Sequence, residues 1–178
     1  TIAASYEQLL HVDTDGGGNT TTLVPVKDGD NGTTFAMQLS TTTVCIDDPT
    51  TSSATQGGVL RLQSDDGAVM ASGHRLGVIE FGGAEDTSST ITTGARIEAL
   101  ADATWSASEN GADMIFYTTD GNASQSEVMR LTADAGTEFT GAVTMSSSSA
   151  SEPVLHITNT HAGATAGEIR FNKDSASG

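Results

Sequence analysis

The 178-residue chain has very little of several residue types: one cysteine, one tryptophan, two tyrosines, three prolines and seven basic residues. A single cysteine, Cys45, excludes an intrachain disulfide. Its neighbours in TTTVCID predict a small buried apolar residue rather than a nucleophile. No apolar run approaches the roughly 20 residues that a membrane helix needs. The opening TIAASYEQLL lacks the features of a signal peptide and an initiator methionine, so we expect a longer parent protein.

The charge is strongly of one sign, with 23 acidic and 7 basic residues and a formal net charge of −16. Such a chain would repel a phosphate backbone, which argues against nucleic acid as a partner. An anionic membrane surface is disfavoured for the same reason, and we expect no membrane insertion. High net charge keeps a protein soluble, and salt screens its self-repulsion, which would suit a saline extracellular setting.

Serine, threonine and glycine are abundant, whereas leucine, lysine and arginine are scarce. Threonine favours extended backbone because it is branched at Cβ, and glycine and aspartate mark tight turns. Regular short apolar runs between the turns predict a β-rich protein with many short strands rather than a partly disordered one. The stretch GARIEALAD (94–102) fits both a strand and a short helix, and its β-rich surroundings favour the strand.

An internal repeat is the most informative feature of the sequence. VLRLQS (59–64) is similar to VLHITN (154–159), and GVIEF (77–81) is similar to GEIRF (167–171), with a loop five residues shorter in the later copy. Alternate positions stay apolar while those between them vary, as expected for strands with one buried face. The apolar positions are Leu60, Leu62, Ile79 and Phe81 in the first copy and Leu155, Ile157, Ile169 and Phe171 in the second.

A second similarity runs in step with the first. FAMQLST (35–41) is similar to EVMRLTA (127–133), and each is followed by a Thr/Ser-rich stretch and then by a Val-Leu pair. The Met-x-Leu pairs are 92 residues apart and the Val-Leu pairs 95. We therefore divide the chain into an N-terminal β segment with a linker (1–56), one complete β module (57–151) and the truncated start of a second copy (152–178), and we expect the natural protein to continue.

The middle module has a thin core for its length. The stretch ADMIFYTT (112–119) is apolar on both faces, so it needs cover on both sides, and a neighbouring subunit is a natural source of the second cover. Roughly a dozen large apolar side chains, at about 1.5–3 kcal/mol each, are little against the ordering entropy of roughly 90 residues. Without disulfides, a metal or an oligomer is needed to stabilise such a module. The candidates for packing in the core or in an interface between subunits are Leu60, Leu62, Ile79, Phe81, Ile97, Met114, Phe116, Met129 and Leu131.

Two acidic glycine-rich loops, DTDGGGN (13–19) and KDGDNG (27–32), resemble calcium loops only in part. They lack a third ligand at the right offset and the glutamate at the twelfth position of an EF-hand. Asp-Gly and Asn-Gly are also the usual residues of tight hairpin turns, so we expect turns and no metal. His156 and His161 have no cysteine or third histidine nearby to complete a zinc set.

Catalytic motifs are missing from the sequence, which contains neither GxSxG nor HExxH. A carboxylate pair for glycoside hydrolysis stays formally open, but the aromatic rings that line sugar clefts are scarce. We therefore expect no enzyme, no catalytic residue and no cofactor. Trp105 is a weak candidate for ligand contact, although packing against the module is the favoured interpretation. Asn19, Asn31 and Asn122 begin Asn-x-Ser/Thr sequons that chance explains in a chain of this composition.

The middle module resembles a module of bacteriophage tail fibres and related virion structural proteins. The pattern falls on GVIEF (77–81), on GARIEALADATW (94–105), on the Phe-x-Thr of 116–118 and on EVMRL (127–131), and the opening stretch is similar to the glycine-rich start of such fibres. Modules of this kind often precede an intramolecular chaperone domain, and neither that domain nor a tip domain is recognisable here. The resemblance implies a homotrimer of intertwined, mostly β modules along a fibre axis.

These expectations predict an all-β structural protein, whose short-stranded β modules intertwine in a homotrimeric fibre as its neck or shaft. Its partners would be two further copies, a tail or capsid adaptor protein, and a host surface glycan or protein. Its location would be the extracellular virion. Two alternatives stay open: a spike with polysaccharide depolymerase activity, favoured by a long β-helix elsewhere in the chain, and a secreted bacterial surface or adhesin module, favoured by an export signal in the full gene.

Overall fold

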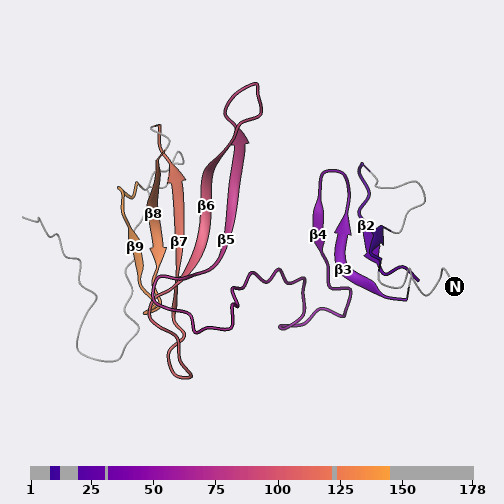
Figure 1. The fold of residues 1–178 in the computed structure, drawn as a ribbon, viewed down its shortest axis with the longest axis horizontal. Helices are drawn as coiled ribbons and strands as arrows, with labels where there is room; N and C mark the ends of the chain where they lie inside the picture. Colours follow the sequence, from indigo (N-terminus) through magenta and orange to yellow (C-terminus); the bar gives the residue numbers. More distant parts are fainter. Residues whose placement is uncertain (1–8, 13–19, 31, 122–123, 145–178) are drawn as a thin grey trace, which may run out of the picture.

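The computed structural model describes residues 9–12, 20–30, 32–121 and 124–144, and these residues form strands, turns and irregular segments without a helix. They contain a four-stranded sheet of order β1-β2-β3-β4 and a five-stranded sheet of order β5-β6-β7-β8-β9, both antiparallel (Figure 1). Each sheet is a meander, in which strands that follow one another in sequence also pair. The strands are β1 His11–Val12, β2 Val24–Lys27, β3 Thr34–Leu39, β4 Val44–Ile46, β5 Arg75–Ala84, β6 Ile91–Ala101, β7 Ala112–Thr119, β8 Gln125–Leu131 and β9 Thr137–Phe139. The predicted all-β fold class is confirmed.

In the N-terminal sheet, one face of strand β2 is buried. Val24 and Val26 are only 6% and 4% exposed. Pro25 lies between them and faces the other way, in register with Gln38 of β3 and through it with Cys45 of β4. Cys45 lies on the face opposite Val24 and is half-buried rather than buried as predicted.

In the five-stranded sheet, the stretch that fitted both a helix and a strand is part of β6. Alternation decides the outcome, because Ala95, Ile97 and Ala99 all point to one face and pair with residues of β5 and β7. The favoured strand prediction is confirmed and the helical alternative is wrong. The β5–β6 hairpin is the longest pairing of the sheet, and its tip extends away from the other strands in Figure 1.

One face of the five-stranded sheet is apolar across all its strands. Directly opposed residues share a face, and the register joins Ile79, Ile97, Phe116, Met129 and Phe139 into one row from β5 to β9. The neighbouring row contains Gly77, Ala99, Met114, Leu131 and Thr137. We call this side the apolar face; its large side chains are those of Ile79, Phe81, Ile97, Met114, Phe116, Met129, Leu131 and Phe139.

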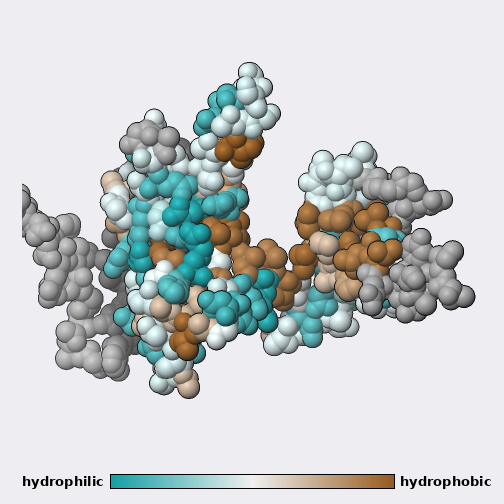
Figure 2. All heavy atoms as spheres, viewed as in Figure 1, coloured by the Kyte–Doolittle hydropathy of each residue, from teal (hydrophilic) through white to brown (hydrophobic). Residues whose placement is uncertain are grey.

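The opposite side, the polar face, carries most of the charge of the sheet. Its rows are Val78, Glu98, Ile115, Arg130 and Glu138, and Glu80, Arg96, Tyr117 and Glu127. Ile115 lies at the centre of this face and has no exposed surface. Figure 2 shows hydrophilic residues over the front of the sheet, with hydrophobic residues gathered on its β5 side and along the linker. The charge thus lies on one face only, as the alternation in the sequence predicts.

The last hairpin of each sheet has the same register. Met37 pairs with Ile46 and Leu39 with Val44 in β3–β4. In β8–β9, Met129 pairs with Phe139 and Leu131 with Thr137. These Met-x-Leu pairs are the ones that the sequence repeat places 92 residues apart. The two sheets therefore end in equivalent hairpins, with one extra residue in the turn of the second.

The prediction of a strand at 59–64 is wrong for the single chain. No described strand pairs with this segment, whose residues are exposed, Leu60 at 67% and Leu62 at 45%. Alternation supplies an apolar face but no hydrogen-bonding partner, and a strand needs both. Leu62 nevertheless lies against the sheet, because a Cβ added at Gly77 would come within 2.7 Å of its Cβ. The later copy of the repeat (152–178) lies outside the described residues.

Candidate functional site

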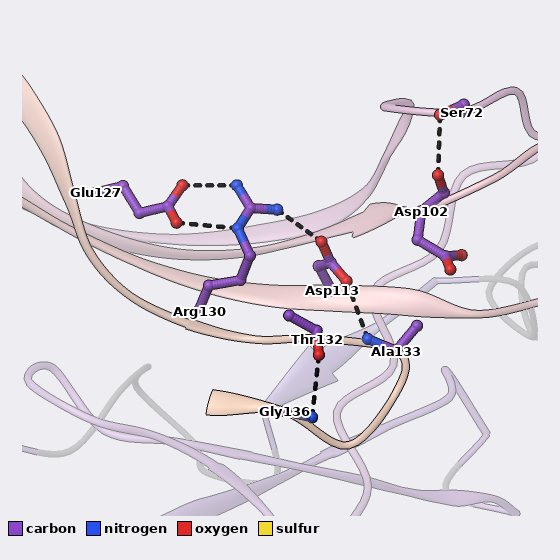
Figure 3. A network of polar contacts seen from close by, with 8 residues as sticks. All are labelled: Ser72, Asp102, Asp113, Glu127, Arg130, Thr132, Ala133 and Gly136. Atoms are coloured by element: carbon purple, nitrogen blue, oxygen red, sulfur yellow. Dashed lines mark hydrogen bonds and ion pairs between the residues drawn. The ribbon is translucent and has the colours of Figure 1, made fainter. Parts of the chain in front are cut away.

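Arg130 holds the β7–β8 end of the polar face together (Figure 3). Its guanidinium donates two hydrogen bonds to the Glu127 carboxylate, at 2.9 and 2.6 Å. A third hydrogen bond of 2.6 Å reaches Asp113 Oδ2 on β7. The other oxygen of Asp113 accepts the backbone N–H of Ala133 at 3.0 Å. Hydrogen bonds to Glu127 and Asp113 raise the pKa of Arg130, so this ion-pair network stays charged and joins two strands to the turn before β9.

A second set of contacts ties the end of the linker to β6. Ser72 Oγ donates to the carbonyl of Asp102 at 2.9 Å, as Figure 3 shows. The backbone N–H of Gly73 donates to the Ala101 carbonyl at 2.7 Å, and the Ala101 N–H donates to the His74 carbonyl at 2.9 Å. Gly73 has a φ of 77°, which favours glycine. These bonds fix where the chain enters β5.

Glu98 is the only buried charged residue among those that the structure describes, at 4% exposure. Its Oε1 accepts a hydrogen bond of 3.3 Å from Arg96, and its Oε2 lies 2.8 Å from Nη2 of Arg75 as an ion pair without hydrogen-bond geometry. The guanidinium of Arg96 lies over the ring of Tyr117, 3.8 Å from its centroid. We call Arg75, Arg96, Glu98 and Tyr117 the Glu98 cluster.

The Glu98 cluster shifts the pKa values of its members. Burial alone would raise the pKa of Glu98, but hydrogen bonds from Arg96 and Tyr117 and the charge of Arg75 outweigh it, so that the pKa is lowered. Burial and the neighbouring Glu98 carboxylate raise the pKa of Tyr117. The lowered pKa keeps Glu98 ionised beside the two arginines, and the raised pKa keeps the Tyr117 phenol neutral. The cluster offers neither a general acid near neutral pH nor an activated nucleophile.

The apolar face is largely open to solvent, unlike the polar face. Exposure reaches 56% at Phe81, 55% at Phe139, 45% at Ile79 and Met114, and 38% at Leu131. Near β5 the face is hollowed by about 270 Å³. The hollow is lined in part by Leu62, Ile79, Ile97 and Met114. Such a contiguous exposed apolar patch is uncommon on a monomer and marks an interaction surface.

Most of the nine packing candidates from the sequence lie on the apolar face. Seven of them lie on the apolar face: Ile79, Phe81, Ile97, Met114, Phe116, Met129 and Leu131. The other two, Leu60 and Leu62, lie in the exposed linker, with Leu62 against Gly77. None of the nine is fully buried within one chain, so they do not form a core of the single chain.

Trp105 follows the end of β6 and is half-buried in an irregular stretch. Its indole N–H donates to the Gly111 carbonyl at 2.9 Å, and its backbone N–H donates to the Met70 carbonyl at 2.9 Å. The ring borders a hollow of about 450 Å³ together with Val69 and Met70. The indole donor is thus occupied within the chain, which fits the favoured interpretation of Trp105 as a packing residue.

The Asp-Gly loop at 27–32 is the turn between β2 and β3. Asp28 Oδ1 accepts the N–H of Thr33 at 2.9 Å, and Asp30 Oδ1 accepts the N–H of Gly32 at 2.8 Å. The hydrogen bonds from Thr33 lower the pKa of Asp28. These contacts are those of a tight turn, as predicted. Asn31, like the loop at 13–19, lies outside the described residues.

Two further aspartates close turns in the same way. Asp86 accepts hydrogen bonds from the N–H groups of Ser88 and Thr90 at the tip of the β5–β6 hairpin. Asp48 accepts them from the N–H groups of Thr50 and Gly57 in the linker. Hydrogen bonds from Thr90 lower the pKa of Asp86, and those from Thr50 lower the pKa of Asp48. Four of the aspartates therefore shape turns and the linker.

Metal-binding clusters of three or more His, Cys, Asp or Glu side chains are not found among the described residues. His156 and His161, Asn19 and Asn122 lie outside them. The part of the chain that the structure describes contains no helix that could span a membrane. Neither a scan against protein-family models nor a search of the curated proteins finds a match to this chain.

Sequence reasoning missed two features of the site. It did not identify the Glu98 cluster, although Arg96 and Glu98 alternate with the apolar residues of β6 and so predict a charged face. It also missed Phe139, which completes the apolar row on β9. The signal for Phe139 was its place in the segment after EVMRL, one residue further along than Ile46 after FAMQL.

Proposed function

We propose that this chain is a structural segment, neck or shaft, of a virion fibre of the tail-fibre kind, which supports attachment to the host cell surface. The observation that carries the proposal is the equivalent closing hairpin of two successive sheets, in step with the 92-residue sequence repeat. Repeated β units joined by extended segments make a long protein out of small parts, and each unit contacts its neighbours. A fibre has that architecture.

The residues that carry the resemblance have structural partners. Gly77 accommodates Leu62, and Trp105 donates its indole N–H to Gly111. The glutamate and arginine of the E-x-M-R motif, Glu127 and Arg130, pair with each other on the polar face of strand β8. A motif whose members hold a sheet together supports a structural function better than a catalytic one.

The proposal includes assembly into a homotrimer. The five-stranded sheet has one fully buried large side chain among the described residues, Ile115, and an open apolar face. A small module with so little buried side chain depends on association for its stability. The proposed further partners are an adaptor protein of the tail or capsid and a surface glycan or protein of the host, and the proposed location is the extracellular virion.

Immunogold electron microscopy tests this function. Antibodies raised against the 178-residue protein should label appendages that project from virions carrying the gene, and peptides of the chain should appear in mass spectra of purified virions. Antibodies against an unrelated acidic protein serve as the control. Label on the surface of uninfected bacterial cells would contradict the proposal and favour the adhesin alternative.

A further inference from the structure

The geometry points to the apolar face of the five-stranded sheet as the surface on which a second copy of this chain docks. This inference rests on the proposed function and gives it a location. The face runs from Ile79 and Phe81 on β5 to Phe139 on β9. It is an open sheet face whose side chains are of the kind that pack between two sheets.

Charge is the first argument for a copy of the chain as the occupant. Two chains with a net charge of −16 each repel one another over most of their surfaces. The paired rows of the apolar face contain apolar residues, threonines and one serine, Ser126, and no charged residue. All the charged residues of the central rows are on the polar face, where the arginines are already paired. The apolar face therefore allows two copies to meet without bringing carboxylates together.

Area is the second argument. Five large side chains of the face are 38–56% exposed. Together with Leu62 they present roughly 600 Å² of apolar surface, since a large side chain has about 150–250 Å² to bury. Specific interfaces bury about 800 Å² per partner, including a polar rim. The face therefore supplies most of one side of a standard interface.

The hollow near β5 is the third argument. At about 270 Å³ it is smaller than the pockets that hold most small ligands. Its lining is mainly apolar and includes Leu62, Ile79, Ile97 and Met114, and Glu98 also borders it. A hollow of this kind accepts a side chain from an opposing sheet, as in sheet-on-sheet packing. Leu62 extends the surface onto the linker, so that the linker takes part in the contact.

Light scattering coupled to size-exclusion chromatography tests the inference on the whole chain. The wild-type protein should have a mass that is a multiple of 18.1 kDa. Phe81→Lys places a charge on the face, and because Phe81 is 56% exposed the substitution leaves the sheet of a single chain intact. We expect Phe81→Lys to reduce the mass to that of one chain. Glu80→Gln, the next residue on the opposite face, makes the same change in net charge and should leave the mass unchanged.

A second variant, Phe139→Lys at the far edge of the face, should also give a monomer, and the circular dichroism of each variant shows whether it folds. The outcomes separate the inference from the proposed function. A wild-type oligomer that survives both lysine substitutions would overturn the inference alone, because another surface then joins the copies. A wild-type monomer at all concentrations would overturn both the inference and the homotrimer, and another part of the chain or another protein would then cover the face.

Discussion

Replacing Glu98 by glutamine should destabilise the five-stranded sheet. Glu98 is 4% exposed and faces two arginines, so Glu98→Gln leaves their charges without a counter-ion. Removing one partner of a buried pair costs about 3–5 kcal/mol. Arg75 is 52% and Arg96 20% exposed, and water screens both, which reduces the expected loss to about 2 kcal/mol. A loss of that size lowers the melting temperature of a small domain by roughly 8–16 °C.

Thermal unfolding followed by circular dichroism measures this loss, with Glu80→Gln as the matched control. Glu80 lies on the same face and directly opposite Arg96, but it is exposed. Its substitution should change stability by less than about 0.5 kcal/mol. Equal melting temperatures for Glu98→Gln, Glu80→Gln and the wild type would refute the argument that burial makes this ion pair important.

The pH dependence gives the same prediction an independent test. The pKa of Glu98 is lower in the folded chain, so its contribution is complete above the unfolded pKa of about 4.3 and is lost as the pH falls through the folded value. The wild type should therefore lose its advantage over Glu98→Gln as the pH is lowered from 6 to below 4 (about two units across the unfolded pKa). A constant difference between the two proteins over that range would contradict the assignment.

Three further outcomes are expected. Gly58→Ala should lower the melting temperature and shift the linker, because a Cβ there would collide with the carbonyl oxygen of Ile46, and an unchanged melting curve would count against this close contact. Trp105→Phe should lower the free energy of unfolding by about 1 kcal/mol in urea titrations, because the hydrogen bond to Gly111 is lost. An unchanged free energy of unfolding would argue against this bond. Adding a chelator should leave the melting temperature unchanged, since the loop at 27–32 is closed by its own aspartates, and a large drop would show that it binds calcium.

Apolar runs with a clear pattern made the longer strands predictable from the sequence. The strands β3, β5 and β8 lie where their alternating apolar positions placed them, because period two defines both a strand and its apolar face, and β7 lies where its continuous apolar run placed it. The strands of two to four residues, β1, β2, β4 and β9, were not identified, since so short a run has no measurable period. The segment 59–64 failed for the opposite reason: it has the period but no partner strand.

The candidate site was predictable in its chemistry but not in its register. The apolar residues were identified one strand at a time, and only the pairing of β5 to β9 shows that they form one face. The Glu98 cluster depends on which residues of neighbouring strands lie opposite one another. Arg75 and Glu98 are 23 positions apart, and nothing local in the sequence links them. Register is set by turns and bulges, such as the bulge between Phe116 and Tyr117, which the composition does not reveal.

The equivalent hairpins have a consequence for the gene as well as for the protein. Because Met37 and Met129 pair in the same way with the strand that follows, a recombination that joins the codons of β3 to those of β8 would keep both the frame and the register. The product would be shorter by 92 residues and would still end in a complete hairpin. The reverse exchange would add one unit. The length of such a protein can therefore change in steps of one module, with a closing hairpin of the same register after each change.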